Sequence, residues 1–135
     1  MTILADTSFL LAALDKDDPH HHAAKTLVER PGTVFVTPVV VLPEVCYLAH
    51  KYMGAETEGR FLQGVLKGDV VVEWGQSEDL HRAVEILQGR PDLGMVDATL
   101  IATAERLKIK QVATFDRRHF NTIRPRHCPA FEILP

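Results

Sequence analysis

The chain has 135 residues, of which 46% are hydrophobic and 24% charged, and its formal net charge is −3, from 15 basic and 18 acidic residues. These values are typical of one globular domain with one core, and we expect a single domain over residues 1–135. The slight acidic excess disfavours a protein that coats nucleic acid through bulk charge, while a local basic patch that grips a short stretch stays compatible with it.

The N-terminal segment and the two cysteines bear on where the protein works. Asp6 interrupts the apolar start MTILADTSFLLAAL, which carries no basic leader and no small-residue cleavage site and is therefore unlike a signal peptide. Cys46 and Cys128 match neither a metal-ligand spacing nor a disulfide framework. No apolar stretch approaches the roughly 20 residues needed to span a bilayer. We therefore expect a cytoplasmic protein without a membrane segment.

Short apolar or β-branched runs alternate with amphipathic segments along the chain. Because such alternation is typical of a parallel sheet covered on both faces, we expect an α/β three-layer sandwich, with a central, mainly parallel sheet flanked by helices and right-handed crossovers. In chain order we expect a strand at 2–5, helices at 8–16 and within 17–31, a strand at 33–37, a helix at 38–53 that Pro43 must start, kink or break, a helix at 55–68, a strand at 69–74, helices at 77–91 and 95–109, and strands at 111–115 and 130–134.

Two carboxylates come at the ends of expected strands. Asp6 follows the first strand, and Asp116 follows the strand that opens the segment QVATFDRRHF. In open α/β sheets, sites form just beyond the carboxyl ends of the strands, so both residues are candidates for a site. Each also has an alternative role as a cap: Asp6 of the helix after it, and Asp116 of the turn RRHF.

A third carboxylate, Asp97, belongs to a helix whose apolar stripe includes Leu100 and Ala104. The stripe reaches Asp97 one turn back, whereas Thr103 and Arg106 are expected on the opposite face. A bare carboxylate on the face turned to the sheet is costly unless it is paired or bound to a metal. The alternative is that Asp97 only complements the helix dipole in the first turn.

Glu44 repeats this pattern, because valines, Tyr47 and Leu48 surround it at helical spacing. Its alternative role is an ion pair with Lys51. Taken together, the four acids favour one site, since a doubly wound sheet can bring strand ends and helix starts to one rim. Close carboxylates repel one another, and a hard divalent cation removes that repulsion. Oxygen-only ligands favour Mg²⁺ or Mn²⁺ over zinc, and such an ion can activate water for displacement at phosphorus.

Four segments in order, LADTSFLLAAL, TPVVVLPEVCYL, DLGMVDATLIATAERL and VATFDRRHF, resemble the signature segments of PIN-domain ribonucleases, above all the VapC toxins of bacterial toxin–antitoxin pairs. The resemblance runs from near the first residue to about Phe120. It implies a PIN-like parallel sheet with an acidic Mg²⁺ or Mn²⁺ pocket that cuts RNA, a small VapB-like antitoxin that covers the pocket, and a homodimer. Pro43 departs from the family pattern, which puts the direction of Glu44 in question.

The resemblance also implies roles for individual residues. The acids that match the family's catalytic and metal-binding positions are Asp6, Glu44, Asp97 and Asp116, and the hydroxyls placed to orient carboxylates or water are Thr7, Ser8 and Thr114. These hydroxyls have an equally simple alternative as turn or capping groups.

The residues around the acids allow further expectations. Arg117, Arg118 and His119 follow the last acid and are candidates to hold an RNA phosphate, with ordinary surface charge as the alternative. Asp92 is expected in a loop rather than in the pocket. The histidines of DDPHHHA are expected at the start of a surface helix rather than as metal ligands, and Trp74 and the phenylalanines in the core rather than as platforms for bases.

Three functions are compatible with these residues. The leading hypothesis is a metal-dependent endoribonuclease, the toxin of a VapBC-type pair, which leaves a 5′-phosphate and a 3′-hydroxyl. The alternative from another class is a non-catalytic PIN-like module that binds RNA or protein, although all four acidic positions are filled here. A phosphatase with a nucleophilic aspartate would want Asp-x-Asp after the first strand, where this chain has DTS.

Overall fold

The computed structural model describes residues 1–135, and its five strands form one fully parallel sheet in the order β3–β2–β1–β4–β5. The strands are β1 (Thr2–Ala5), β2 (Val34–Pro38), β3 (Val71–Glu73), β4 (Gln111–Ala113) and β5 (Glu132–Leu134). The helices are α1 (Thr7–Leu14), α2 (His21–Val28), α3 (Val41–Met53), α4 (Ala55–Lys67), α5 (Ser77–Gly89), α6 (Met95–Leu107) and α7 (Arg117–Thr122). None of these helices is long and apolar enough to cross a bilayer.

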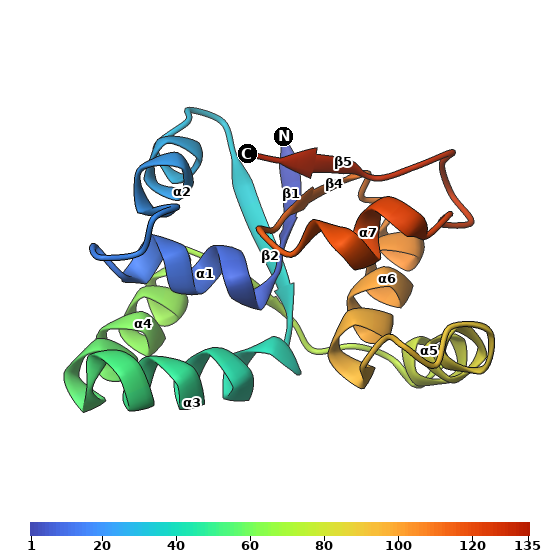
Figure 1. Ribbon diagram of the computed structural model, residues 1–135, viewed down its shortest axis with the longest axis horizontal. Helices are drawn as coiled ribbons and strands as arrows, with labels where there is room; N and C mark the ends of the chain where they lie inside the picture. Colours follow the sequence, from blue (N-terminus) through green and yellow to red (C-terminus); the bar gives the residue numbers. More distant parts are fainter.

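The helices cover both faces of the sheet, which confirms the expected three-layer sandwich. Figure 1 shows α1 to α4 on one side of the strands and α5 to α7 on the other. The strand order explains this division: β1, β2 and β3 step outward in one direction, while β4 and β5 lie on the other side of β1. Because crossovers between parallel strands are right-handed, connections that step in opposite directions place their helices on opposite faces.

Pro43 does not break its helix. It is the third residue of α3, within the first turn, where the backbone N–H has no intrahelical partner in any case. The helix therefore continues without interruption to Met53. Pro38, which the sequence pattern placed at the start of this helix, is instead the last residue of β2.

The segment after Asp116 was expected to be a turn and is the short helix α7. Six residues are too few to show a helical repeat, so periodicity gives no signal there. The helix is held by Phe120, which is 1% exposed and makes an edge-on contact with Phe131, with ring centroids 6.1 Å apart.

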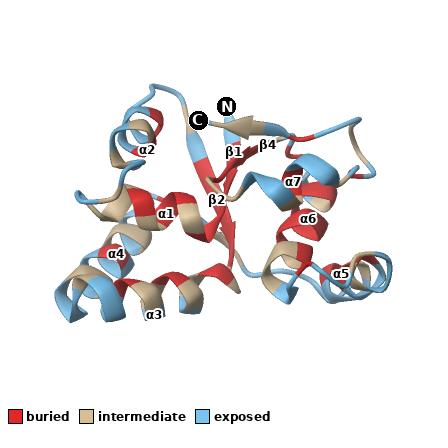
Figure 2. Ribbon diagram, in the orientation of Figure 1, coloured by how far each residue is buried: buried red, intermediate tan, exposed pale blue.

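The core lies between the sheet and the helix faces turned toward it, as the burial pattern in Figure 2 shows. Phe9 of α1 is 1% exposed and stacks on Phe35 of β2 at 5.2 Å and on Phe115 at 6.4 Å. The phenylalanines are thus largely core residues, as expected. The same expectation for Trp74 was wrong, because Trp74 follows the edge strand β3 and is 76% exposed.

The face of α6 opposite its apolar stripe is also covered. Thr103 is 1% exposed, and Arg106 donates to Asp79 of α5 at 2.8 and 3.0 Å and to Glu73 at 2.7 Å. Burial opposes the charge of Asp79, but the hydrogen bonds and positive charge of Arg106, together with the hydrogen bond from the backbone of Gln76, outweigh it and lower the pKa of this carboxyl. The periodicity of α6 identified the face toward the sheet and gave no sign that α5 packs on the other face.

Replacing Phe9 by alanine should lower the free energy of unfolding by about 3–5 kcal/mol, because the change removes a fully buried ring and leaves a cavity between two aromatic neighbours. Urea unfolding of the two proteins measures the difference. The matched control is Leu66→Ala, since Leu66 is 89% exposed and its loss should change stability by no more than about 0.5 kcal/mol. Equal effects of the two substitutions would contradict the packing described for Phe9.

Candidate active site

The centre of the site is set by the pairing of β1 with β4. Ala5 is opposite Ala113, and the backbone N–H of Asp6 donates to the carbonyl of Ala113 at 3.1 Å. Asp6 and Thr114 are the next residues after this pair, so they lie side by side at the carboxyl ends of two parallel strands. The chain leaves β1 into α1 and β4 into α7, on opposite faces of the sheet, and in α/β folds a crevice forms at such a point.

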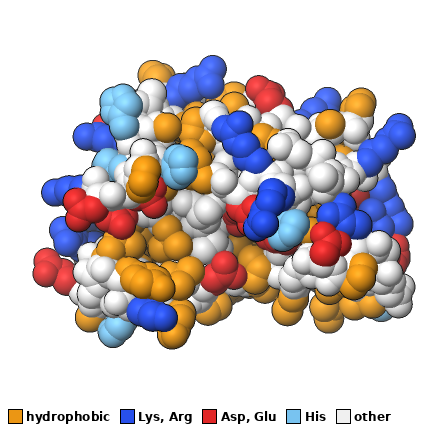
Figure 3. All heavy atoms as spheres, viewed as in Figure 1, with side chains coloured by type: hydrophobic (Ala, Val, Ile, Leu, Met, Phe, Trp, Pro, Cys, Tyr) orange, Lys and Arg blue, Asp and Glu red, His pale blue; other side chains and the backbone are white.

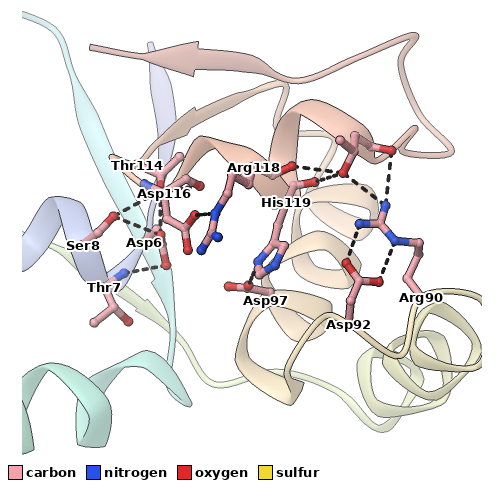
Figure 4. A network of polar contacts seen from close by, with 11 residues as sticks. Asp6, Thr7, Ser8, Arg90, Asp92, Asp97, Thr114, Asp116, Arg118 and His119 are labelled. Carbon is pink, nitrogen blue, oxygen red and sulfur yellow. Dashed lines mark hydrogen bonds and ion pairs between the residues drawn. The ribbon is translucent and has the colours of Figure 1, made fainter.

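The side chain of Asp6 is held by three donors (Figure 4). The backbone N–H of Thr7 donates to Oδ1 at 2.7 Å, while the hydroxyls of Ser8 and Thr114 donate to Oδ2 at 3.2 and 2.6 Å. Asp6 is the N-cap of α1, as the alternative interpretation held, and it also lines the cleft. One carboxylate thus has both roles.

The same hydroxyls hold the segment that carries Asp116. Thr114 Oγ1 accepts a hydrogen bond from the backbone N–H of Asp116 at 3.0 Å, and Ser8 Oγ accepts one from that of Phe115 at 2.9 Å. The side chain of Asp116 makes no capping hydrogen bond to α7, so its alternative role as a cap is wrong. Its Oδ1 lies 3.6 Å from Nε of Arg118 instead.

The structure brings all four predicted acids to one cleft. Asp6, Glu44, Asp97 and Asp116 line an open cavity of ≈ 440 Å³, together with Thr7 and Ser8. Glu44 is in the first turn of α3 and Asp97 in the first turn of α6, so both come from helix starts that face the strand ends. Figure 3 shows acidic side chains in the hollow between the two halves of this face, with basic and histidine side chains beside them.

Sequence reasoning missed the partner of Asp97. His119 Nδ1 donates to Asp97 Oδ2 at 2.6 Å, a contact across 22 residues of sequence. No local spacing encodes this pairing. The suggested pair of Glu44 with Lys51 does not form, since the Lys51 amine lies over the rings of Tyr47 and Tyr52. Asp92 pairs with Arg90 in the loop before α6 and does not line the cleft, as expected.

The basic residues after Asp116 have different surroundings. Arg117 donates to the carbonyl oxygen of Pro135 at 2.6 Å and is thereby held beside β5. The side chain of Arg118 is 87% exposed above Asp116 and is free to meet an anion at the cleft. At the floor, Thr7 Oγ1 is buried without a hydrogen-bond partner.

The histidines of DDPHHHA lie at the start of α2. His21 Nδ1 is 2.8 Å from the carbonyl of Ala12, and His20 stacks on Phe115 with ring centroids 4.3 Å apart. The segment thus joins α2 to α1 and to the residue before Asp116.

The surroundings of Asp6 disfavour the ionised form of its carboxyl group. Burial raises the pKa of Asp6 to about 6, and the negative charge of Asp97 adds to the rise. The hydrogen bonds from Thr114, Thr7 and Ser8 act in the opposite direction without cancelling it. A divalent cation bound by these carboxylates would relieve the repulsion.

The four acids are oxygen donors of the kind that Mg²⁺ and Mn²⁺ take. No group of three or more histidine, cysteine, aspartate or glutamate side chains is gathered closely enough to hold a metal ion in this structure. Two of the acids are turned to basic partners, Asp97 to His119 and Asp116 to Arg118. The donor chemistry therefore fits such an ion, while the side-chain arrangement would have to tighten around it.

Asp6→Asn should stabilise the protein at neutral pH in a chelating buffer, because it removes a buried charge while the side-chain oxygen can still accept from Thr7. A folded-state pKa near 6 against an ordinary value of 3.8 means that wild type loses on the order of 3 kcal/mol from this group as the pH rises from about 4 to 7. The variant is spared this loss, so its advantage in unfolding free energy should grow over that range.

Urea unfolding of wild type and Asp6→Asn at pH 4, 5.5 and 7.5 measures that difference. The ¹³C carboxyl signal of Asp6, assigned by its absence from the variant, supplies the direct control and should titrate near pH 6. A stability difference that stays constant with pH would contradict the raised pKa.

Known proteins are similar to this chain in sequence and in fold. Ribonuclease VapC26 of Mycobacterium tuberculosis is 27% identical over 135 residues, covering 98% of this chain and all of that protein. The crystal structure of Mycobacterium tuberculosis VapC20, a toxin that cleaves the sarcin–ricin loop, is similar with a TM-score of 0.78 at 28% identity, covering 86% of this chain and 91% of that one.

A more distant structure has the same fold. VapBC2 from Rickettsia felis, bound to a DNA fragment from its promoter, matches with a TM-score of 0.74 at 15% identity and full coverage of both chains. The PIN domain family matches residues 3–124, which include all four acids of the cleft. The chain therefore belongs to the PIN-domain family.

Proposed function

We propose that the protein is a metal-dependent endoribonuclease, a single PIN-like nuclease domain over residues 1–135 that hydrolyses phosphodiester bonds of RNA. The observation that carries this proposal is the convergence of Asp6, Glu44, Asp97 and Asp116 on one cleft at the switch point of the sheet. The relatives of similar length support it, since VapC26 is a ribonuclease and VapC20 is a toxin that cleaves the sarcin–ricin loop.

Mg²⁺ or Mn²⁺ is the proposed cofactor, held by Asp6, Asp97 and Asp116. A divalent cation supplies Lewis acidity and neutralises charge that develops on phosphate oxygens. The raised pKa of Asp6 supports this assignment, because burial and, to a lesser degree, the charge of Asp97 disfavour its ionised form where no cation is bound. Glu44, which makes no hydrogen bond in the cleft, serves either as a further ligand or as the general base that accepts a proton from the attacking water.

The other residues of the cleft bind and orient. Ser8 and Thr114 fix one oxygen of Asp6, which keeps its carboxylate in one orientation. The exposed guanidinium of Arg118 is available to a phosphate, whereas the hydroxyl of Thr7 is buried and lacks a hydrogen-bond partner. We assign Arg117 a smaller role in phosphate binding, because its guanidinium already donates to the carbonyl oxygen of Pro135. The products would be a 5′-phosphate and a 3′-hydroxyl.

The proposed biological role is that of a toxin inhibited by a small VapB-like antitoxin that covers the cleft. The solved complexes that share this fold include a toxin–antitoxin complex from Klebsiella pneumoniae, with a TM-score of 0.68. We place the action in the cytoplasm, where the RNA is, and propose a homodimer by analogy with the family.

Asp97→Asn should lower RNA cleavage by at least about 100-fold, the upper end of what the loss of even an outer-shell partner costs a metal site. The assay incubates antitoxin-free protein with sarcin–ricin loop RNA and total cellular RNA in Mn²⁺ and maps the new ends, with EDTA as a second control. Asp17→Asn, which removes an exposed acid far from the cleft, should cleave as wild type does.

Full activity of a folded Asp97→Asn protein would reject the site. Binding of RNA by wild type with no cleavage under any metal condition would favour the non-catalytic binding module instead.

Mn²⁺ should also stabilise the protein in the absence of RNA. At a free concentration of 100 times Kd, one bound ion adds about 2.7 kcal/mol to the free energy of unfolding, and EDTA should remove the gain. Urea unfolding with and without Mn²⁺ measures it. Asp6→Asn should show little of this effect and Asp17→Asn all of it. Stabilisation that persists in Asp6→Asn would place the ion elsewhere.

A further inference from the structure

His119 reaches from α7 to Asp97 of α6 at the edge of the cleft (Figure 4). Nδ1 must carry the hydrogen of this 2.6 Å bond, because an ionised carboxylate only accepts. The two side chains are 23% and 21% exposed, so water competes for the contact less than it would on an open surface. Nδ1 is thereby committed to Asp97 and is not available to an RNA phosphate, the role that sequence reasoning considered for His119.

The contact distinguishes Asp97 from the other acids of the cleft. Asp6 is held by three donors, whereas His119 is the only side chain that donates to Asp97, and it does so to Oδ2 alone. The second oxygen, Oδ1, has no partner within the protein. Without His119, rotation about the side-chain bonds of Asp97 would be free to exchange the two oxygens and to turn both of them away from Asp6.

Helix α7 is itself held on two sides, so His119 is a fixed donor. On the side away from the cleft, Arg90 donates to the carbonyl and the hydroxyl of Thr122 at 3.4 and 3.1 Å, and Asp92 pairs with the same guanidinium at 2.7 and 2.8 Å. On the inner side, the fully buried ring of Phe120 fastens the helix to the core. The imidazole therefore meets Asp97 from a constrained backbone.

We propose that His119 is a positioning residue, whose Nδ1–H holds Oδ2 of Asp97 and leaves Oδ1 for a divalent cation. This inference rests on the proposed function, since it assigns a part in the same site. Carboxylate ligands of metals are themselves commonly hydrogen-bonded, and loss of such an outer partner costs about 10–100-fold in metal affinity or activity. The opposite role, in which His119 competes with the cation for Asp97, predicts a gain of affinity on its removal.

The test is a calorimetric titration of the full chain with Mn²⁺ alone, without RNA. His119→Ala should weaken Mn²⁺ binding by about 10–100-fold. His119→Asn should restore most of the affinity, because its side-chain amide N–H lies close to the place of Nδ1. Asn121→Ala is the matched control, since Asn121 is exposed on the same helix, makes no side-chain hydrogen bond and should leave the affinity unchanged.

Urea unfolding of all three variants separates positioning from a purely structural role. If His119 only fastened α7, then alanine and asparagine would change stability while the Mn²⁺ affinity stayed at the wild-type value, and the inference would be overturned. Tighter binding by His119→Ala would overturn it in favour of competition.

The outcome for wild type distinguishes this inference from the function on which it rests. Wild type that binds no Mn²⁺ would reject the proposed metal chemistry, and the role of His119 with it. Wild type that binds Mn²⁺ and cleaves RNA, together with a His119→Ala protein of equal affinity, would reject only the role of His119.

Discussion

The pairing of β1 with β4 is the constraint on which the site depends. These strands lie side by side at the centre of the sheet although more than 100 residues separate them, and the register of Ala5 with Ala113 fixes which residues emerge together at the rim. A shift by one residue would turn Asp6 or Thr114 to the other face of the sheet, because side chains alternate along a strand. The hydroxyl network around Asp6 and the start of α7 follow from this register.

Two aspartates with equally little exposed surface have pKa values that are shifted in opposite directions. Asp6 and Asp79 are each 5% exposed, yet the pKa of Asp6 is raised and that of Asp79 is lowered. Asp79 receives two hydrogen bonds from the guanidinium of Arg106, whereas at Asp6 the effect of burial is opposed only by neutral donors, and the charge of Asp97 adds to the rise. The chain therefore has the means to neutralise a buried acid but places only neutral donors around Asp6, which leaves its charge for a cation to balance.

Helix α7 connects two of the acids in the cleft. It begins directly after Asp116, carries His119 toward Asp97, and is fastened by Arg90 to the loop that precedes α6. The four acids thus come from four separate parts of the chain. Helix α7 connects two of them, because it follows Asp116 directly and contacts Asp97 through His119. The helix is too short to produce a helical repeat in the sequence, so the pattern did not predict it. Its tertiary contacts explain why the segment is helical.

The sequence by itself determined the order of strands and helices, the parallel sheet, and the four acids at strand ends and helix starts, because these follow from periodicity and from residues close in the chain. Only the tertiary structure decided which acid meets which partner. The contact of His119 with Asp97, the pairing of Arg106 with Asp79 of α5 and the exposure of Trp74 at a sheet edge all depend on elements that are distant in sequence. No local pattern encodes such contacts, since they arise from the packing of whole layers.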